Sequence, residues 1–192
     1  MQIYYTNNYT GAKDESHRLL ERAIAAYDEE HAFSGNAGSR SLAVKNAANL
    51  VADMRTTEMG KPYIPDWNEF SISHSESSWA VLIADGSDKH IDCCGLDIQF
   101  EREVKVLKLA ERWYHPDELA CEFFRIWTRR EALVKASGES IVNSNLPSTR
   151  EDEVKFRDAV WQLRDVAIPG IDHAAICAKQ ISDIKLAELR TE

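Results

Sequence analysis

The beginning of the chain alternates between hydrophobic and polar positions and then changes to a helical spacing. Ile3 and Tyr5 alternate with their neighbours, which predicts a short strand. From residue 14 to about residue 30, hydrophobic residues recur every three or four positions and predict a helix. A second helix is expected from Ser39, a residue type that caps helices, to about Met54. The first part of the chain should therefore combine a strand with two helices.

The middle of the chain has the spacing of strands. Residues 70–75 alternate, and residues 79–84 form a short hydrophobic run that suits a buried strand. In residues 94–100 the hydrophobic side chains share one face of a predicted strand, while Asp97 and Gln99 share the other. We therefore expect Asp97 and Gln99 to be neighbours on one face of a sheet.

The second half of the chain again combines helices with strands. Helical spacing returns around residues 104–114, and Pro116, at a typical first position, predicts a long helix that ends at Gly138. Residues 154–156 and 171–178 are expected to be strands. Because each half joins a long helix to a few strands, the pattern predicts an α+β fold of two lobes. The expected lobes are residues 1–94 and 95–192.

The composition narrows the possible classes of function. The 192 residues are 44% hydrophobic and 29% charged, which supports a folded core and excludes disorder. The chain has 32 acidic against 23 basic residues, a net charge of −9, which argues against a nucleic-acid partner. No hydrophobic run approaches the roughly 18 residues of a membrane helix. With no signal-peptide pattern, and with four cysteines that lack zinc or disulfide spacing, a cytoplasmic protein is expected.

The long predicted helix carries charged residues at helical spacing. Trp127, Glu131 and Lys135 are four residues apart and fall on one stripe of the helix. By its spacing alone, the stripe is more typical of an exposed Glu–Lys pair beside an interfacial tryptophan. It also suits a carboxylate that binds a metal or a proton, next to an ammonium that neutralises phosphate.

Asp97 adds a second carboxylate to that stripe. Carboxylate and amide oxygens two residues apart on a strand, as in Asp97 and Gln99, can reach the same hard cation. Together with a helix carboxylate they form a plausible Mg²⁺ site. The alternative is that Asp97 is a polar residue on an exposed sheet face.

Three further residues can contact anions. Arg40 lies in the first turn of a predicted helix, where a positive charge opposes the helix dipole unless an anion binds nearby. Lys61 follows Gly60 in a turn, where surface lysines are common, and His74, next to Ser73, is at a site typical of a structural histidine. The sequence has no motif of serine hydrolases, P-loop proteins, Rossmann dehydrogenases or zincins.

In their order, these segments resemble the 4′-phosphopantetheinyl transferases, in particular the surfactin-synthetase-activating type. The resemblance extends over residues 60–138, and Arg40-Ser-Leu matches more loosely. The type is a single-chain pseudo-dimer of two similar lobes, each a long helix on a small, mostly antiparallel sheet. Its matching motifs are Gly60-Lys61-Pro62, Phe70-Ser-Ile-Ser-His74-Ser75, Gly95-Leu-Asp97-Ile and Trp127-Thr-Arg-Arg-Glu131-Ala-Leu-Val-Lys135-Ala-Ser-Gly138.

The resemblance implies a reaction and partners. The family moves the phosphopantetheine arm of coenzyme A to a serine hydroxyl of an acyl, peptidyl or aryl carrier protein and releases adenosine 3′,5′-bisphosphate. It implies an active site between the lobes and a monomeric enzyme. The N-terminal lobe would contact coenzyme A and the C-terminal lobe would carry the metal and the catalytic residues.

The resemblance also implies the roles of individual residues. Asp97 and Glu131 would hold Mg²⁺, with Glu131 as the base and Lys135 steadying the phosphate charge. The coenzyme A phosphates would be held by Arg40, Lys61 and His74, with Ser73 nearby.

The chain departs from the family at Gln99, where many relatives have a glutamate. An amide can give the metal one oxygen but no charge, so metal affinity is expected to differ. Gln99 also favours an alternative function, a degenerate relative that binds coenzyme A without transfer. An acidic scaffold would explain the composition but not the order of the motifs.

A surface for the acidic carrier is expected on the long helix. Three aromatic residues lie near three arginines in sequence, a combination that can form an apolar and basic patch: Phe123, Phe124 and Trp127 with Arg125, Arg129 and Arg130. The alternative is that Phe123 and Phe124 belong to the core.

Overall fold

A computed structural model describes residues 1–32, 46–84, 94–103, 106–139 and 146–190. Its fold is a mixture of helices and sheets, as the sequence predicts. The helices are α1 (Glu15–Ala32), α2 (Ala47–Ala52), α3 (Val106–Trp113) and α4 (Phe123–Ser137), with a short 3₁₀ helix η1 (Pro116–Glu118). The segment expected from residue 39 to residue 54 is described only from residue 46, where α2 begins after the cap residue Asn46.

The described strands form two four-stranded sheets and a small ribbon. The first sheet has the order β10-β1-β5-β4 and the second the order β6-β9-β8-β7, while β2 pairs with β3. The strands are β1 (Gln2–Thr6), β2 (Arg55–Thr56), β3 (Pro62–Tyr63), β4 (Phe70–Ser75), β5 (Ser78–Ile83), β6 (Cys94–Gln99), β7 (Glu153–Phe156), β8 (Ala159–Asp165), β9 (His173–Ala178) and β10 (Lys185–Glu188).

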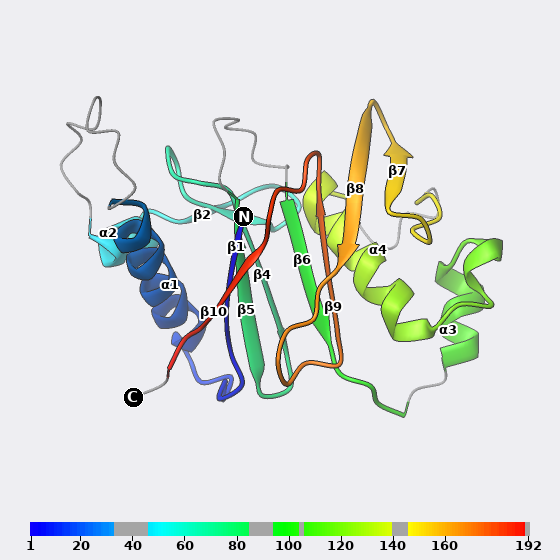
Figure 1. The fold of residues 1–192 in the computed structure, drawn as a ribbon, viewed down its shortest axis with the longest axis horizontal. Coiled ribbons are helices and arrows are strands. Elements are labelled where there is room, and N and C mark those ends of the chain that lie inside the picture. The colour runs from blue at the N-terminus through cyan, green and yellow to red at the C-terminus, as the bar shows by residue number, and fades with distance from the viewer. Residues whose placement is uncertain (33–45, 85–93, 104–105, 140–145, 191–192) are drawn as a thin grey trace.

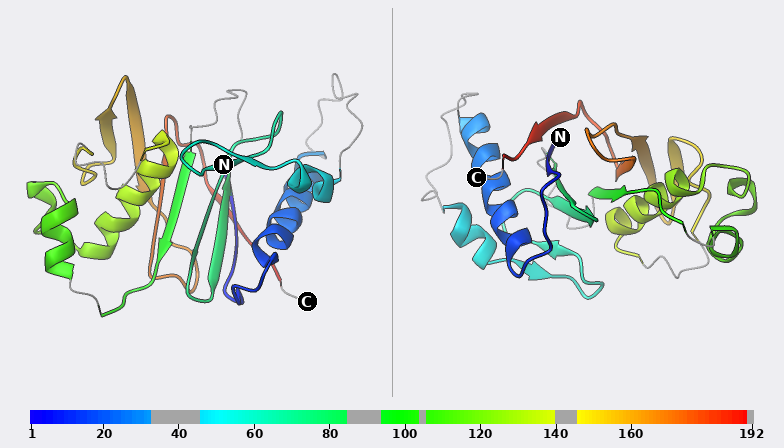
Figure 2. Two further views of the ribbon diagram at one scale, coloured as in Figure 1. Left: turned by 180° about the vertical axis from the view of Figure 1, so that it is seen from behind. Right: turned by 90° about the horizontal axis from the view of Figure 1, so that it is seen from below.

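The elements stack in four layers. Helices α1 and α2 cover the outer face of the first sheet, and α4 covers the outer face of the second, with α3 beyond it (Figures 1 and 2). Between the sheets lies an apolar core that includes Ile3 and Leu82 of the first sheet with Leu96 and Ile176 of the second. Because both faces of β1 and β5 are covered, all of their residues are buried, whereas β7, β8 and β10 have exposed positions.

The two sheets meet where β6 lies against β4. These strands are in contact but form no backbone ladder. Instead, the backbone N–H groups of Leu96 and Ile98 on β6 donate to the hydroxyls of Ser71 and Ser73 on β4, at 2.9 and 3.2 Å. Serine hydroxyls therefore accept the backbone hydrogen bonds of this edge of β6. The junction between the two sheets is thus lined by polar groups.

The chain returns to the first sheet near its end. Strand β10 pairs with β1 in parallel, with Gln2 opposite Lys185 and Tyr5 opposite Glu188. Figure 1 shows this strand crossing beside β1, away from the second sheet. Residues 185–188 thus lie with the N-terminal half, whereas the sequence assigned residues 95–192 to one lobe.

The prediction of one long helix from Pro116 to Gly138 is wrong at its beginning. Pro116 starts only the short turn η1, and α4 begins at Phe123. The buried carboxylate of Glu118 pairs with Arg130 at 2.8 Å, although twelve residues of continuous helix would separate them by about 18 Å. The chain must fold back between them, and this contact breaks the helix. Its predicted end is confirmed, because Gly138 caps α4 at φ 69°.

The strands predicted at residues 3–5, 70–75, 79–84 and 94–100 are confirmed as β1, β4, β5 and β6. Strands β2, β3, β8 and β10 were not anticipated. Among the described residues, no helix is long and apolar enough to cross a membrane.

Candidate functional site

Gly95 allows α4 to approach β6 closely. A Cβ at this position would lie 2.7 Å from the backbone nitrogen of Ala136 and nearer still to the backbone oxygen of Ala132. Any larger residue would therefore collide with the helix backbone. The close approach brings the last two turns of α4 over the strand position of Asp97.

Asp97 is the centre of a compact polar cluster. Its buried carboxylate accepts a hydrogen bond from Ser73 Oγ at 2.9 Å and is paired with Lys135 Nζ at 2.8 Å. The Lys135 ammonium also donates to Ser73 Oγ at 3.1 Å and to the Leu96 carbonyl oxygen at 3.0 Å. The structure therefore brings together Ser73 of β4, Asp97 of β6 and Lys135 of α4, three of the residues that the sequence singled out.

Glu131 lies one helical turn before Lys135 and completes the cluster. Burial raises the pKa of Glu131, the negative charge of Asp97 raises it further, and Lys135 opposes both effects. Its carboxylate makes no hydrogen bond within the described part of the chain. The site thus holds one carboxylate that is paired with Lys135 and a second, that of Glu131, whose charge the first repels.

Lys61 reaches the same edge of β6 from the loop before β3. Its buried ammonium donates to the Cys94 carbonyl oxygen at 3.0 Å. Lys135 binds the carbonyl of Leu96, two residues further along, so the two ammonium groups bind neighbouring carbonyls about 7 Å apart on the strand. No carboxylate partner of Lys61 is found among the described residues, so its positive charge adds to the potential at this edge.

His74 does not share the position of Ser73. Because side chains alternate along β4, Ser73 points toward β6, whereas His74 is exposed and contacts the ring of Tyr9 at 5.3 Å between centroids. Arg40 lies outside the described residues. Four residues were expected near the phosphates of coenzyme A: Arg40, Lys61, Ser73 and His74. Of these, only Ser73 forms a hydrogen bond with Asp97 in the described part of the structure.

Gln99 is half-buried on the same strand, two positions after Asp97, and lies opposite His173 of β9.

Beyond Gln99 is a group of three titratable side chains that sequence reasoning missed. His173 Nε2 lies 3.2 Å from Glu101 Oε1 and 3.1 Å from Glu122 Oε1. These atoms could surround a metal ion, but an imidazole N–H between exposed carboxylates explains them equally well. The sequence does contain a signal for this group, because polar residues continue at every second position after Asp97, at Gln99 and Glu101.

The expected basic docking patch is contradicted at Arg129. This side chain is 1% exposed, and its guanidinium donates to Asp165 and Asp152, both at 2.6 Å, and to the backbone carbonyls of residues 149–151. Arg125 is partly exposed and also pairs with Asp165, at 2.8 Å. Arg129 therefore anchors the segment before β7 and is not available to a partner. Arg130, expected in the same patch, is also buried, at 2% exposure, and is paired with Glu118.

The aromatic residues of the same helix, Phe123, Phe124 and Trp127, are partly buried. Phe123 stacks on Tyr114 and on Trp127, and all three pack around Ile126. They hold α3 against the beginning of α4 and are part of a small core.

A profile of the 4′-phosphopantetheinyl transferase superfamily matches residues 93–164. Residues 93–164 belong to this superfamily. The matched segment contains Asp97, Gln99, Glu131 and Lys135, and it extends from β6 through α4 to β8.

Three curated relatives carry the superfamily name. Gsp of Aneurinibacillus migulanus is 29% identical over 111 residues, which are 52% of this chain and 44% of Gsp. AcpT of Salmonella typhimurium is 32% identical over 126 residues, 55% of this chain and 62% of AcpT. Ffp of Bacillus subtilis is 28% identical over 142 residues, 66% of this chain and 60% of Ffp. Each of the three is named a 4′-phosphopantetheinyl transferase, and the chain spans about half the length of the relatives it matches.

Proposed function

We propose that the chain transfers the 4′-phosphopantetheine arm of coenzyme A to a serine hydroxyl of an apo carrier protein and releases adenosine 3′,5′-bisphosphate. The observation that carries this proposal is the cluster of Asp97, Glu131 and Lys135, which lies within the segment that matches the superfamily. Phosphoryl transfer needs positioned charges more than covalent catalysis, and the cluster offers two carboxylates and an ammonium.

The donor set fits a magnesium ion. Asp97 and Glu131 offer hard oxygen ligands, which Mg²⁺ prefers, and Gln99 offers an amide oxygen on the same strand. Glu131 has no hydrogen-bond partner in the described structure, and its carboxylate is repelled by that of Asp97, so a cation between them would relieve an unfavourable contact. When bound, Mg²⁺ would neutralise the pyrophosphate of coenzyme A.

The residues of the chain itself would transfer the proton and stabilise the charge that develops during the reaction. Glu131 accepts the proton from the carrier serine, whose oxygen forms a bond to the phosphorus next to the pantetheine arm. The bond from that phosphorus to the bridging oxygen of the pyrophosphate breaks, and adenosine 3′,5′-bisphosphate leaves with the electron pair. The raised pKa of Glu131 makes it a stronger base than an exposed glutamate. Lys135 stabilises the charge that develops on the phosphates.

The junction of β4 and β6 is the proposed active site between two similar lobes, each a helix on a four-stranded sheet. Lys61 supplies a positive charge at this junction. Arg40 and His74 would hold outer phosphates of coenzyme A, while Ser73 positions Asp97 and Lys135. We propose that the protein acts as a cytoplasmic monomer with coenzyme A and a carrier as partners.

A mass measurement tests the proposal. The protein is incubated with coenzyme A, Mg²⁺ and an apo carrier, and a carrier whose serine is replaced by alanine is the matched control. A mass gain of about 340 Da on the carrier, the mass of the arm, is expected only with the serine present.

The second candidate function is coenzyme A binding without transfer, which Gln99 favours because it lowers the charge at the metal site. Binding of coenzyme A by calorimetry with no mass gain on any carrier would support it. Neither binding nor transfer would overturn both functions.

A further inference from the structure

Three side chains beside the end of β6 form a group that the proposed transfer reaction does not use. Glu101 lies two residues after β6, His173 is the first residue of β9, and Glu122 is the cap residue before α4. Two carboxylate oxygens and one imidazole nitrogen of this group all lie within 4.8 Å of one another. Three separate elements of the chain thus bring one ligand atom each to the same place.

The spacing of these atoms is that of ligands around one small ion. His173 Nε2 lies 3.2 Å from Glu101 Oε1 and 3.1 Å from Glu122 Oε1. Two ligands that are each about 2.1 Å from a zinc ion, at octahedral or tetrahedral angles, are about 3.0–3.4 Å apart. A divalent ion therefore fits between the three atoms without a large movement of any of them.

The charge of the group favours an ion over a hydrogen bond alone. An imidazole N–H shared by both carboxylates fits these distances, but a neutral imidazole leaves two negative charges and an imidazolium still leaves one. Neither Glu101 nor Glu122 pairs with a lysine or arginine of the described residues. Asp172, whose carboxylate accepts from the Glu101 backbone N–H at 3.0 Å, adds a further negative charge. A divalent cation would balance this excess.

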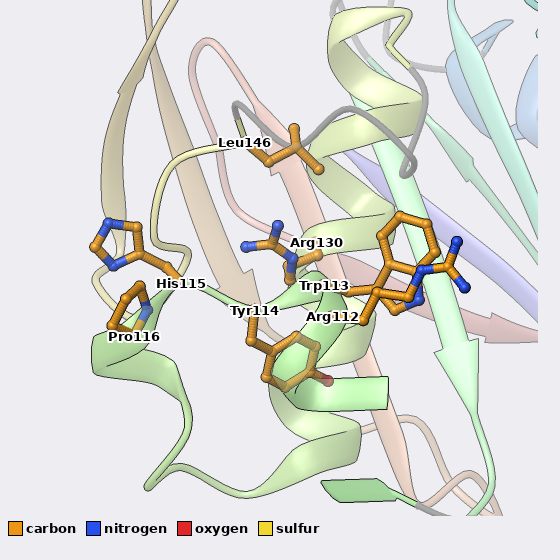
Figure 3. Close-up of a pocket in the computed structure, with 7 residues that line it drawn as sticks. All are labelled: Arg112, Trp113, Tyr114, His115, Pro116, Arg130 and Leu146. Carbon is orange, nitrogen blue, oxygen red and sulfur yellow. The ribbon is translucent and has the colours of Figure 1, made fainter. Parts of the chain in front are cut away.

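The arginines at the beginning of α4 already have acidic partners. Arg125 and Arg129 both pair with Asp165. Arg130, in the middle of the pocket that Figure 3 shows, pairs with the buried carboxylate of Glu118 at 2.8 Å. These three guanidinium groups are therefore not available to Glu101 or Glu122.

The group is open to solvent on one side and fixed on the other. The side chains of Glu101 and Glu122 are 65% and 53% exposed, so an ion can reach them and keep water ligands. The His173 side chain is only 14% exposed, and its ring stacks on Phe124 with 5.9 Å between the centroids. The imidazole is thus held in place before an ion binds, while the two carboxylates can adjust to it.

The ligand types indicate the kind of ion. Mg²⁺ and Ca²⁺ prefer oxygen ligands, whereas imidazole suits zinc and other divalent ions of the first transition row. Three protein ligands with an open position for water are typical of zinc sites that are not purely structural. The group therefore differs in chemistry from the Asp97 cluster, where Asp97, Gln99 and Glu131 offer only oxygen.

We propose that Glu101, Glu122 and His173 bind one Zn²⁺ ion, which joins the end of β6 and the beginning of β9 to the beginning of α4. The inference goes beyond the transfer reaction and does not depend on it, because none of the three residues takes part in the transfer. Since only the folded chain brings the three ligands together, bound Zn²⁺ also stabilises the fold.

Calorimetry with Zn²⁺ tests the site, with Mg²⁺ in excess so that the Asp97 cluster is occupied by the ion it prefers. The unmodified protein should bind one Zn²⁺ ion, and His173→Gln and Glu122→Gln should each weaken the binding by roughly tenfold or more, because each removes one of three ligands. His17→Gln, which replaces an exposed histidine of α1, is the matched control and should bind normally. No saturable binding, or equal binding by His173→Gln, would overturn the proposal.

Thermal unfolding distinguishes this group from the Asp97 cluster. Zn²⁺ should raise the Tm of the unmodified protein and of Asp97→Asn, but not that of His173→Gln. The opposite result, a rise in His173→Gln and none in Asp97→Asn, would place the ion at the Asp97 cluster and overturn the proposal. Circular dichroism shows whether His173→Gln is folded. If it is not, Glu122→Gln decides the question in both measurements, because its side chain is exposed.

Discussion

The two carboxylates at the junction of the sheets differ in their hydrogen-bond and ion-pair partners. Asp97 accepts from Ser73 and is paired with Lys135, so it is part of the hydrogen-bonded framework between β4, β6 and α4. Glu131 is half-buried beside it and has no hydrogen bond within the described residues. Replacing either acid should reduce transfer, but the two changes should affect stability in opposite ways.

Glu131→Gln should lower the rate of transfer by about a hundredfold or more, because it removes both a base and a metal ligand. The free energy of unfolding should stay the same or rise, since the variant removes a buried charge that Asp97 repels. Carrier mass spectrometry and urea unfolding measure the two effects. Glu111→Gln, an exposed acid on α3, is the control. Near-normal transfer by Glu131→Gln would contradict its role.

Asp97→Asn should also abolish most transfer, but it should lower the free energy of unfolding by about 1–3 kcal/mol. The loss is expected because the ammonium of Lys135 would keep only its neutral partners, and the broken pair is largely buried. Urea unfolding measures the change. A variant as stable as the unmodified protein would mean that the pair contributes nothing to the fold.

Gln99→Glu should tighten the binding of Mg²⁺ several-fold, because it adds a charged oxygen two positions from Asp97. The concentration of Mg²⁺ at half-maximal transfer should fall, while the KM for coenzyme A stays nearly constant. An unchanged Mg²⁺ titration would show that residue 99 does not contact the metal.

At the scale of elements, the site depends on how closely a helix can lie on a strand. The glycine at position 95 removes the side chain that would separate β6 from α4, and the ammonium of Lys135 then reaches the strand backbone. The hydroxyls of Ser71 and Ser73 hold the other side of β6. Strand β6 is thus held by side chains of α4 and of β4, although no backbone ladder joins β6 to β4.

Gly95→Ala should destabilise the protein by about 3 kcal/mol, the upper part of the usual range for overpacking, because the new methyl group meets helix backbone. Transfer should fall with it, since α4 must shift away from Asp97. Thermal unfolding and the carrier assay measure both. Adding Ala132→Gly should not restore either property, because the obstacle is the carbonyl oxygen and not the Ala132 side chain. Restoration would indicate that side-chain contacts set the spacing.

Local patterns in the sequence predicted much of this framework. Alternation located β4 and β6, and the four-residue spacing placed Glu131 and Lys135 on the same face of α4. The break before α4 could not be predicted, because it depends on a buried pair between Glu118 and Arg130 that only the folded chain creates. The same limit applies to Arg129, whose acidic partners are 23 and 36 residues away in sequence.

At the scale of the whole molecule, Arg129 ties α4 to the second sheet. Its guanidinium joins Asp165 at the end of β8 to Asp152 before β7, and Arg125 adds a second contact to Asp165. Both arginines lower the pKa of Asp165 below its usual value, although burial alone would raise it. The stabilisation from this carboxylate is therefore present above about pH 4, the pKa of an unfolded aspartate, and is lost as the pH falls through the lower folded value.

Asp165→Asn should lower the free energy of unfolding by about 1 kcal/mol at neutral pH, because solvent screens a carboxylate that is 40% exposed, and the difference from the unmodified protein should shrink as the pH falls below about 4. Urea unfolding at pH 7 and pH 3 measures it. Asp158→Asn, at an exposed turn, should show little effect at either pH. A difference that does not depend on pH would mean that shape, and not charge, makes Asp165 important.

The parallel pairing of β1 with β10 has a consequence for synthesis on the ribosome. The two strands are 183 residues apart at their aligned positions Gln2 and Lys185, so β10 emerges long after β1. During that interval one edge of β1 has no partner, although β5 can already occupy the other edge. An open edge of this kind can pair with the edge of another nascent chain. Completion of the first sheet is therefore a late, long-range step, and a slow stage of translation before residue 185 would prolong the period in which aggregation competes with folding.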